Sequence, residues 1–123
     1  MKLDLIKFKT AKIAKEKGFD IETIYYYDFI GDICSSTINS INWNASQTEM
    51  YSTPTQALLK KWLHDVEGVL FVEKFFTTHQ EKFVEHTYVC DFYYDNKWYK
   101  SPRLETPEEA LEYALQKALE TLN

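Results

Sequence analysis

The residues of this chain that could support metal or nucleophilic chemistry are few and far apart. They are His64, His79, His86, Cys34 and Cys90. A structural zinc site needs about four ligands held tetrahedrally, and no pair here has the spacing of a ligand motif. On an expected strand, Cys90 and His86 would stand about 13 Å apart, which is too far for proton transfer. We therefore expect no metal, no cofactor and no cysteine nucleophile, with Cys90 in the core.

A run of acidic residues is the next candidate for chemistry. Glu105, Glu108, Glu109 and Glu112 could supply an acid–base pair or a metal cluster. Carboxylates are also stabilised in the first turn of a helix by the helix dipole, and we prefer this interpretation. The chain has only 3 glycines and none of the glycine-rich motifs that cradle phosphates. The prediction is a protein that is not an enzyme.

One stretch, FYYDNKWYK at 92–100, combines aromatic rings with nearby cations. The rings could fill a sheet-on-helix core, form a protein interface, or stack on the bases of a single strand. We rank these interpretations in that order. The candidate interaction surface consists of Tyr93, Lys97, Trp98, Tyr99, Lys100 and Arg103.

Length and composition favour one globular domain over residues 1–123. The chain is 45% hydrophobic and 27% charged, and its net charge of −5 disfavours a general binder of phosphate backbones. Its 8 Phe, 3 Trp and 9 Tyr need a broad sheet or a partner surface. Charges interrupt every apolar run of the basic N-terminal segment. We therefore expect no signal peptide and no membrane span, and place the protein in the cytoplasm.

The N-terminal part predicts a helix, a hairpin and a loop. Residues 1–19 should hold a helix that ends at Gly18 in a left-handed conformation. Residues 20–51 should form a hairpin that turns near Gly31, followed by a polar loop at 38–51. A loop of this length in a small domain is either mobile or functional.

The phrase TPTQALLKKWL predicts the start of a second helix. Thr53 is a good N-cap, Pro54 suits the first helical position, and Gln56 would complete a capping box. Gly68 should end this helix. Its expected apolar stripe is Leu58, Leu59, Trp62, Leu63 and Val66.

The phrase ETPEEALEYALQKAL predicts the start of the last helix by the same chemistry. Thr106 is the expected N-cap, Pro107 the first helical residue and Glu109 the capping-box partner. Small alanines should let this helix approach a sheet closely. Its two apolar columns are Ala110, Leu111, Ala114, Leu115, Ala118, Leu119 and Leu122.

Three strands are expected between these two helices, at 69–78, 82–95 and 97–104. A tight turn at Asp95 and Asn96 should join the last two. The predicted fold class is α+β, an antiparallel sheet of three to five strands with helices packed on one face. From residue 52 onward its order is α-β-β-β-α. The apolar face of the middle strand would consist of Val84, Tyr88, Cys90, Phe92 and Tyr94.

This helix–three strands–helix order resembles the double-stranded-RNA-binding domain. TPTQALLKKWL stands where the first helix of that family begins, and EEALEYALQKAL resembles its last helix. The likeness is topological and covers little more than half of the chain. That family binds RNA through a lysine-rich patch at the start of its last helix, where this chain has Glu105, Glu108 and Glu109. Because carboxylates repel phosphate, we expect the topology without binding to double-stranded RNA.

A second resemblance covers most of the chain. The segments that carry it are, in order, TAKIAKEKGF, YYYD, PTQALLKKWL and EEALEYALQKAL. Through these segments the chain resembles a group of small uncharacterised proteins of gut bacteria and their phages. This resemblance implies a bacterial or phage setting and no particular chemistry.

The expected function is that of a non-catalytic, cytoplasmic accessory protein that acts through protein contacts. The alternative is a nucleic-acid-binding module with an atypical acidic charge. Both faces of the sheet carry rings to cover, because Phe83, Val89 and Tyr93 point away from the apolar face. Either the N-terminal part covers this second face or another protein does. A second copy would be the simplest cover, which predicts a homodimer.

Overall fold

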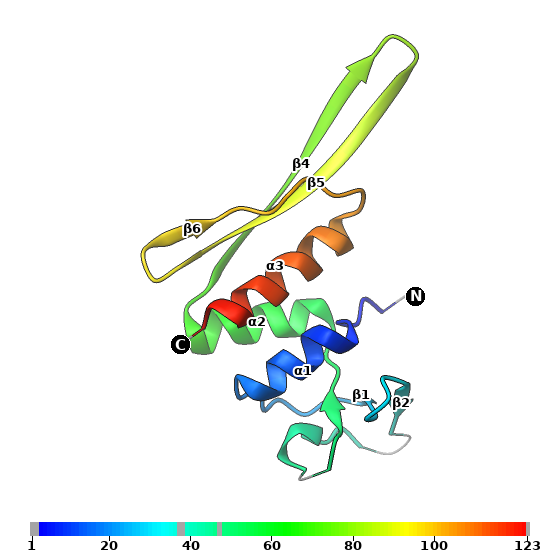
Figure 1. The fold of residues 1–123 in the computed structure, drawn as a ribbon, viewed down its shortest axis with the longest axis vertical. Coiled ribbons are helices and arrows are strands. Elements are labelled where there is room, and N and C mark those ends of the chain that lie inside the picture. Colours follow the sequence, from blue (N-terminus) through cyan, green and yellow to red (C-terminus); the bar gives the residue numbers. More distant parts are fainter. Residues whose placement is uncertain (1–2, 37–38, 47, 123) are drawn as a thin grey trace.

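The computed structural model describes residues 3–36, 39–46 and 48–122 (Figure 1). The α+β class and the order α2-β4-β5-β6-α3 of the C-terminal part are confirmed. In chain order the elements are α1 (Phe8–Glu16), β1 (Tyr25–Tyr27), β2 (Ile33–Ser35), the 3₁₀ helix η1 (Trp43–Ala45), β3 (Tyr51–Ser52), α2 (Gln56–Glu67), β4 (Leu70–Gln80), β5 (Phe83–Tyr94), β6 (Lys97–Tyr99) and α3 (Pro107–Thr121).

The larger of two sheets has the strand order β4-β5-β6 and is antiparallel throughout. β4 and β5 form a long hairpin that closes between Gln80 and Phe83. β5 continues into β6 through Asp95 and Asn96, whose φ angles are 52° and 63°. These left-handed values are typical of a two-residue hairpin turn, so the predicted tight turn is confirmed.

Helices cover one face of this sheet, as predicted (Figure 1). α3 packs along β5, and both α1 and α2 pack against α3. Paired residues of antiparallel strands point to the same face. The register therefore places Phe71, Cys90 and Phe92 together on the helix-facing face, where all three are buried. We call the opposite side the open face, since no helix of the described residues lies on it (Figure 1).

α3 supplies the central layer of the core. The Thr106 hydroxyl accepts a hydrogen bond of 3.1 Å from the Glu109 backbone N–H, and Pro107 opens the helix, so the predicted N-cap is confirmed. The predicted columns Ala110, Leu111, Ala114, Leu115, Ala118, Leu119 and Leu122 are all buried.

α2 begins two residues later than predicted, and the assignment of Thr53 as its N-cap is wrong. Thr55 is the N-cap, with its hydroxyl accepting from the Leu58 backbone N–H at 3.2 Å. Thr53 is held extended, because its own N–H donates to the Tyr25 carbonyl beside β3. Gln56, expected to complete a capping box, reaches across to α3 instead.

The apolar stripe of α2 is confirmed except at its end. Leu59, Trp62 and Leu63 are buried, whereas Val66 is 61% exposed. Gly68 ends the helix as predicted, with a φ of 72°.

The N-terminal helix starts at Phe8, and the residues before it are extended. Leu5 forms a bridge with Thr55, and the Ile6 N–H donates to the Pro54 carbonyl at 3.1 Å. This pairing also explains why α2 cannot begin at Pro54. Further along, α1 ends as predicted at Gly18, which has a φ of 92°.

A carboxylate from another helix caps the start of α1. Lys7, in the N-cap position, forms no side-chain capping bond. Glu112 of α3 instead accepts hydrogen bonds from the Lys7 backbone N–H at 3.0 Å and from the Thr10 hydroxyl. Its second oxygen accepts from the Gln56 amide at 3.0 Å. Burial, and then the charge of Glu112, raise the pKa of Tyr27.

The predicted N-terminal hairpin forms a separate small sheet with the order β2-β1-β3. Its turn contains Gly31, whose φ is 90°. The Phe8 ring lies close to this glycine, because a Cβ added at Gly31 would stand 3.0 Å from a ring carbon of Phe8. Residues 38 and 47 of the predicted polar loop lie outside the described residues. The described remainder packs near α1, where Lys15 Nζ donates to the Met50 carbonyl at 2.9 Å. Neither the described part of this loop nor α1 covers the open face (Figure 1).

The last predicted strand is interrupted. β6 covers only Lys97–Tyr99, and the Ser101 hydroxyl accepts from the Cys90 N–H at 2.8 Å in place of a backbone carbonyl. Leu104 then resumes the pairing, exchanging two 2.8 Å hydrogen bonds with Tyr88. Within the described ranges, no helix is both long and apolar enough to cross a membrane.

Candidate interaction surface

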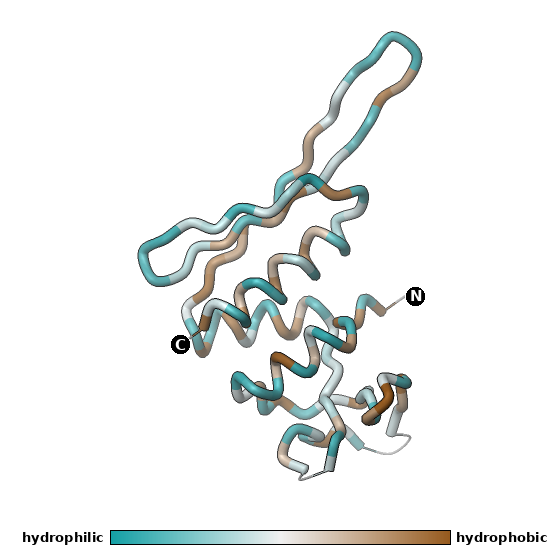
Figure 2. The backbone as a smooth tube through the Cα atoms, in the orientation of Figure 1, coloured by the Kyte–Doolittle hydropathy of each residue, from teal (hydrophilic) through white to brown (hydrophobic). Residues whose placement is uncertain are grey.

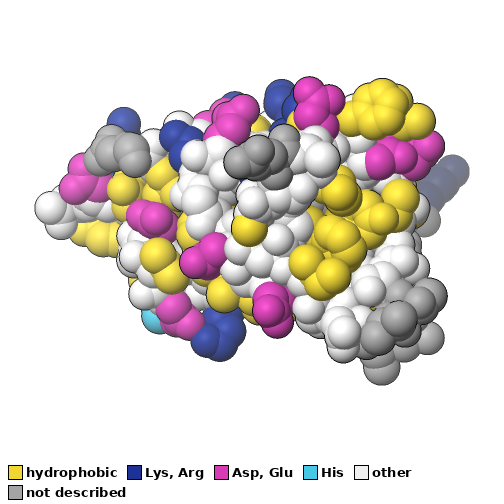
Figure 3. Space-filling model, turned by 90° about the horizontal axis from the view of Figure 1, so that it is seen from below, with side chains coloured by type: hydrophobic (Ala, Val, Ile, Leu, Met, Phe, Trp, Pro, Cys, Tyr) yellow, Lys and Arg dark blue, Asp and Glu magenta, His cyan; other side chains and the backbone are white. Residues whose placement is uncertain are grey.

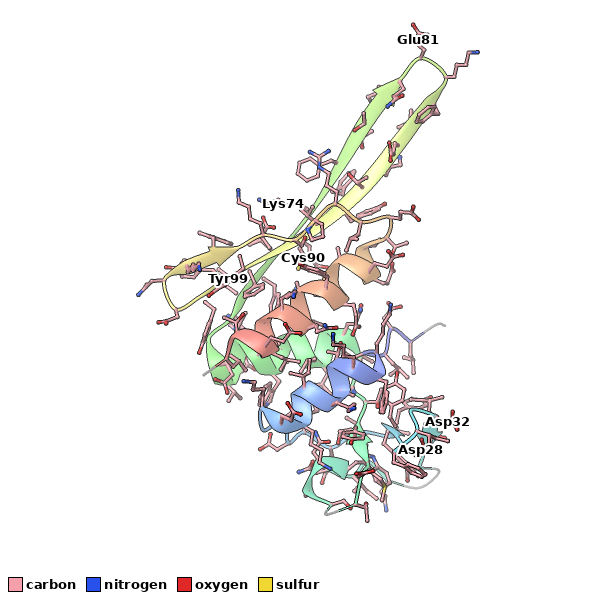
Figure 4. The ribbon with its side chains drawn as sticks, viewed as in Figure 1. Asp28, Asp32, Lys74, Glu81, Cys90 and Tyr99 are labelled. Atoms are coloured by element: carbon pink, nitrogen blue, oxygen red, sulfur yellow. The ribbon has the colours of Figure 1, made fainter. Side chains whose placement is uncertain are left out.

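The β4–β5 hairpin extends well beyond the helices (Figure 1). β4 has 11 residues and β5 has 12, which corresponds to about 36–40 Å of strand. α3 has 15 residues and so covers only about 22 Å. The far part of the hairpin, residues 75–87, therefore projects as a two-stranded ribbon that we call the arm. In Figure 4, Lys74 marks its base and Glu81 its tip.

The arm exposes large apolar side chains on both of its faces. Phe75 is 65% and Val84 51% exposed on the helix-facing side, and Phe83 is 54% exposed on the open side. Phe76, also on the open side, is partly exposed. Hydrophobic and hydrophilic segments alternate along the arm (Figure 2). Single exposed apolar residues are normal, but such a concentration on a thin ribbon is typical of an interaction site.

The structure divides the predicted surface between the two faces of the sheet. Tyr99 lies on the helix-facing side, stacked on the buried Phe92 with a centroid distance of 4.7 Å (Figure 4). Lys97 holds its ammonium group 5.1 Å from the centroid of the Tyr99 ring. Lys100 and Tyr99 line a cavity of about 320 Å³ between β6 and α3. The core interpretation therefore fits Tyr99. Tyr99, Lys97 and Lys100 do not form one surface with the remaining residues of the predicted surface, which lie on the open side.

Tyr93, Trp98 and Arg103 belong to the open side. Tyr93 and Trp98 face each other across β5 and β6, with a centroid distance of 5.1 Å, and Trp98 is 52% exposed. The Arg103 guanidinium lies over the ring of Phe76, 4.3 Å from its centroid. Together with the exposed Leu70, these residues extend the apolar surface of the arm along the open face.

The sequence analysis did not single out Phe75, Phe76 and Phe83, although they are central to this surface. A usable signal was present, because the two long strands exceed the reach of a 15-residue helix. The residues furthest from α3 in the hairpin then have no layer to cover them. Alternation alone cannot reveal this, since it indicates which residues share a face and not whether that face is covered.

The charge of the arm is close to zero. Residues 75–87 include Glu81, Glu85 and one lysine, Lys82, besides two histidines. At the base, Lys74 forms an ion pair with Asp91 at 3.2 Å. The arm therefore lacks the excess of cations with which proteins contact phosphate backbones.

The cysteines and histidines do not form a reactive cluster. Cys90 is buried in the core as expected, and burial, followed by the charge of Glu73, raises its pKa to about 12. His86 contacts the Thr77 hydroxyl at 3.1 Å and the Phe75 ring on the arm. Among the residues that the structure describes, no group of three or more His, Cys, Asp or Glu could hold a metal ion.

A second exposed apolar group lies at the opposite end of the molecule. Phe29, Ile30 and Ile33 surround the turn between β1 and β2, and all three are exposed. Figure 3 shows hydrophobic side chains gathered on this end of the molecule. One carboxylate oxygen of Asp28 accepts hydrogen bonds from the Ile30 and Asp32 N–H groups within this turn.

Comparisons with protein-family models, with curated proteins and with solved structures find no match for this chain.

Proposed function

We propose that this chain is a non-catalytic, cytoplasmic accessory protein whose arm docks onto another protein subunit. The observation that carries the proposal is the exposure of Phe75, Phe83 and Val84 on a ribbon that the body of the protein does not cover. A two-stranded ribbon has little stability of its own in water. Docking would bury its rings and complete its hydrogen bonding. A bacterial or phage setting is part of this proposal.

The composition of the surface supports a protein partner over a nucleic acid. Interfaces between proteins are enriched in aromatic residues and arginine, the residue types found at Phe76, Trp98 and Arg103. Single-stranded nucleic acids also stack on rings, but they need a cationic groove beside them. The arm has a near-neutral charge, and Lys97 and Lys100 lie towards the helix-facing side.

A photocrosslinking experiment tests the docking role. Phe83 on the arm is replaced by p-benzoylphenylalanine, and the exposed Val66 on α2 is replaced in the same way as the control. The cells that naturally produce the protein are then irradiated. We expect a discrete adduct from position 83 and none from position 66, and the adduct should form again from the purified components. Equal adducts at both positions, or none at position 83, would refute the proposal.

Nucleic acids and membranes give the competing outcomes. Fluorescence anisotropy with single-stranded oligonucleotides and with double-stranded RNA at physiological salt should show no binding. Glu105, Glu108 and Glu109 stand at the start of α3, where carboxylates would repel phosphate. Cosedimentation with anionic vesicles should likewise leave the protein in the supernatant. Tight and strongly salt-dependent binding to RNA would favour the alternative function.

A further inference from the structure

Among the strands that the structure describes, β4 pairs only with β5, so its other backbone edge has no neighbouring strand. On β5, the N–H groups of Tyr88 and Cys90 point towards β6, where they donate to Leu104 and Ser101. In an antiparallel sheet these directions alternate, so the odd-numbered residues of β5 bond to β4. Val89 pairs with Lys74 in this register. The backbone N–H and C=O groups of the even-numbered residues of β4 therefore point towards β5. Those of the odd-numbered residues point the other way, to the outer edge of the sheet, and we call these residues outward.

The residues of β4 whose backbone groups point to this outer edge are Phe71, Glu73, Phe75, Thr77 and His79. Within the described ranges, none of their backbone groups takes part in a hydrogen bond to another segment. Natural sheets usually protect such an edge with proline, bulges or several lysines. β4 pairs with β5 without a bulge, contains no proline, and has one lysine that is already paired with Asp91. This edge is open for the addition of a strand.

We infer that the partner on this edge is a second copy of the chain, paired β4 to β4 about a two-fold axis at Phe75. The inference rests on the proposed docking role of the arm. Two identical edges form a closed, self-complementary interface, the commonest arrangement of oligomers. The product is one six-stranded sheet in the order β6-β5-β4-β4-β5-β6. The helices of both copies lie on one face of this sheet.

Hydrogen bonding selects the register centred on Phe75. It aligns residues 70–80 with residues 80–70 of the second copy, so all five outward residues of each strand find a partner. Each such pair exchanges two bonds, giving about ten in all. A shift of two residues towards either end leaves one outward residue of each copy unpaired. One of those shifts also places Lys74 directly opposite the Lys74 of the second copy, so that two like charges face each other.

Side chains across the interface are compatible in this register. Phe75 meets the Phe75 of the second copy, and Lys74, which forms an ion pair with Asp91 of its own copy, lies opposite Phe76. Glu73, whose carboxylate forms an ion pair with Lys60 of α2 at 2.9 Å, lies opposite Thr77. No pair of like charges stands directly opposite, an arrangement that would destabilise the sheet. The rings of the arm, exposed in one copy, are then flanked by the base of the other hairpin.

Charge substitutions at Thr77 test both the dimer and its register. Thr77 is exposed, so either a glutamate or a lysine can replace it in the single copy. Opposite Glu73, Thr77→Glu should weaken the dimer and Thr77→Lys should strengthen it. Lys60 already offsets part of the charge of Glu73. Each pair occurs twice, which corresponds to a change of about two- to five-fold in the dissociation constant. Sedimentation equilibrium of the purified protein at micromolar concentration measures this constant.

Proline substitutions identify the edge. Thr77→Pro removes an outward N–H of β4 and should abolish the dimer, whereas Val84→Pro removes an outward N–H of β5 and should preserve it. Circular dichroism checks that both variants fold, and the charge variants decide the matter if either does not. A wild-type monomer, equal effects of Thr77→Glu and Thr77→Lys, or dissociation by Val84→Pro alone overturns the inference. A monomer that still gives the position 83 adduct with a different protein leaves the proposed function standing.

Discussion

The guanidinium of Arg103 lies 4.3 Å from the centroid of the Phe76 ring. Arg103 follows β6 and belongs to the body of the protein, whereas Phe76 belongs to the arm. The contact therefore ties the base of the arm to the open face of the sheet.

Arg103→Ala should loosen the arm without unfolding the body. An exposed cation–ring contact contributes about 0.5–1 kcal/mol. We expect faster amide exchange at Phe76, measured by NMR, and little change in α3. Lys100→Ala is the matched control, since Lys100 is exposed but lies away from the arm. Unchanged exchange at Phe76 in Arg103→Ala would show that the contact does not hold the arm.

Glu112→Gln should destabilise the fold as a whole. The carboxylate accepts from Lys7, Thr10 and Gln56, and an amide NH₂ in its place would face a donor. Leaving a buried donor unsatisfied costs about 1–3 kcal/mol, so urea denaturation should show a loss of this size. The exposed Glu109 provides the control, because Glu109→Gln should cost much less. Equal losses at both positions would contradict the role of Glu112 in capping α1.

Thr55→Ala and Thr106→Ala should each lower the free energy of unfolding by about 0.5–2 kcal/mol, because each removes a hydroxyl that caps a helix. The double variant should be nearly additive, since the two caps share no hydrogen-bond partner. Thr55→Ser and Thr106→Ser retain the oxygen and should recover most of the loss in urea denaturation. If the serine variants are as unstable as the alanine variants, the caps are not responsible.

The buried thiol of Cys90 should make the protein less stable in alkaline solution. Burial raises its pKa from an ordinary 9.0 to about 12, so the unfolded chain releases this proton first. The stabilisation is complete below pH 9 and falls as the pH rises from 9 towards 12. Urea denaturation across this range should show a shallower loss for Cys90→Ala than for the wild type. Identical slopes would contradict a protonated thiol in the core.

Local chemistry predicted the helix ends well wherever tertiary contacts agreed with it. Thr106 and Gly68 are where their side-chain and backbone preferences place them. Thr53 was chosen as the cap because Pro54 follows it, whereas the helix begins after Thr55. The later start depends on the hydrogen bond from the Ile6 N–H to the Pro54 carbonyl, a contact that no local pattern contains. For the same reason, the cap that Glu112 provides to α1 could not be predicted from the sequence around Lys7.

The candidate site was only partly accessible to sequence reasoning. Alternation along β5 correctly placed Cys90 and Phe92 on the apolar face. It could not show that the helices stop short of Phe75 and Phe83, because coverage depends on the relative lengths and positions of distant elements. Arg103 was selected for its charge near the rings of residues 92–100, and the structure places it against Phe76, a ring of the arm outside that stretch.

Amide exchange in the arm of the whole protein, measured as a function of protein concentration, tests most directly the central claim that two copies pair through their β4 edges. The outward N–H groups of Phe75, Thr77 and His79 should exchange rapidly in dilute solution, and raising the concentration should protect them as the β4 edges pair. The outward N–H groups of Val84 and His86, on the other edge of the same arm, should remain unprotected. Exchange that does not depend on concentration at Thr77, or protection that appears equally on both edges, would contradict the account.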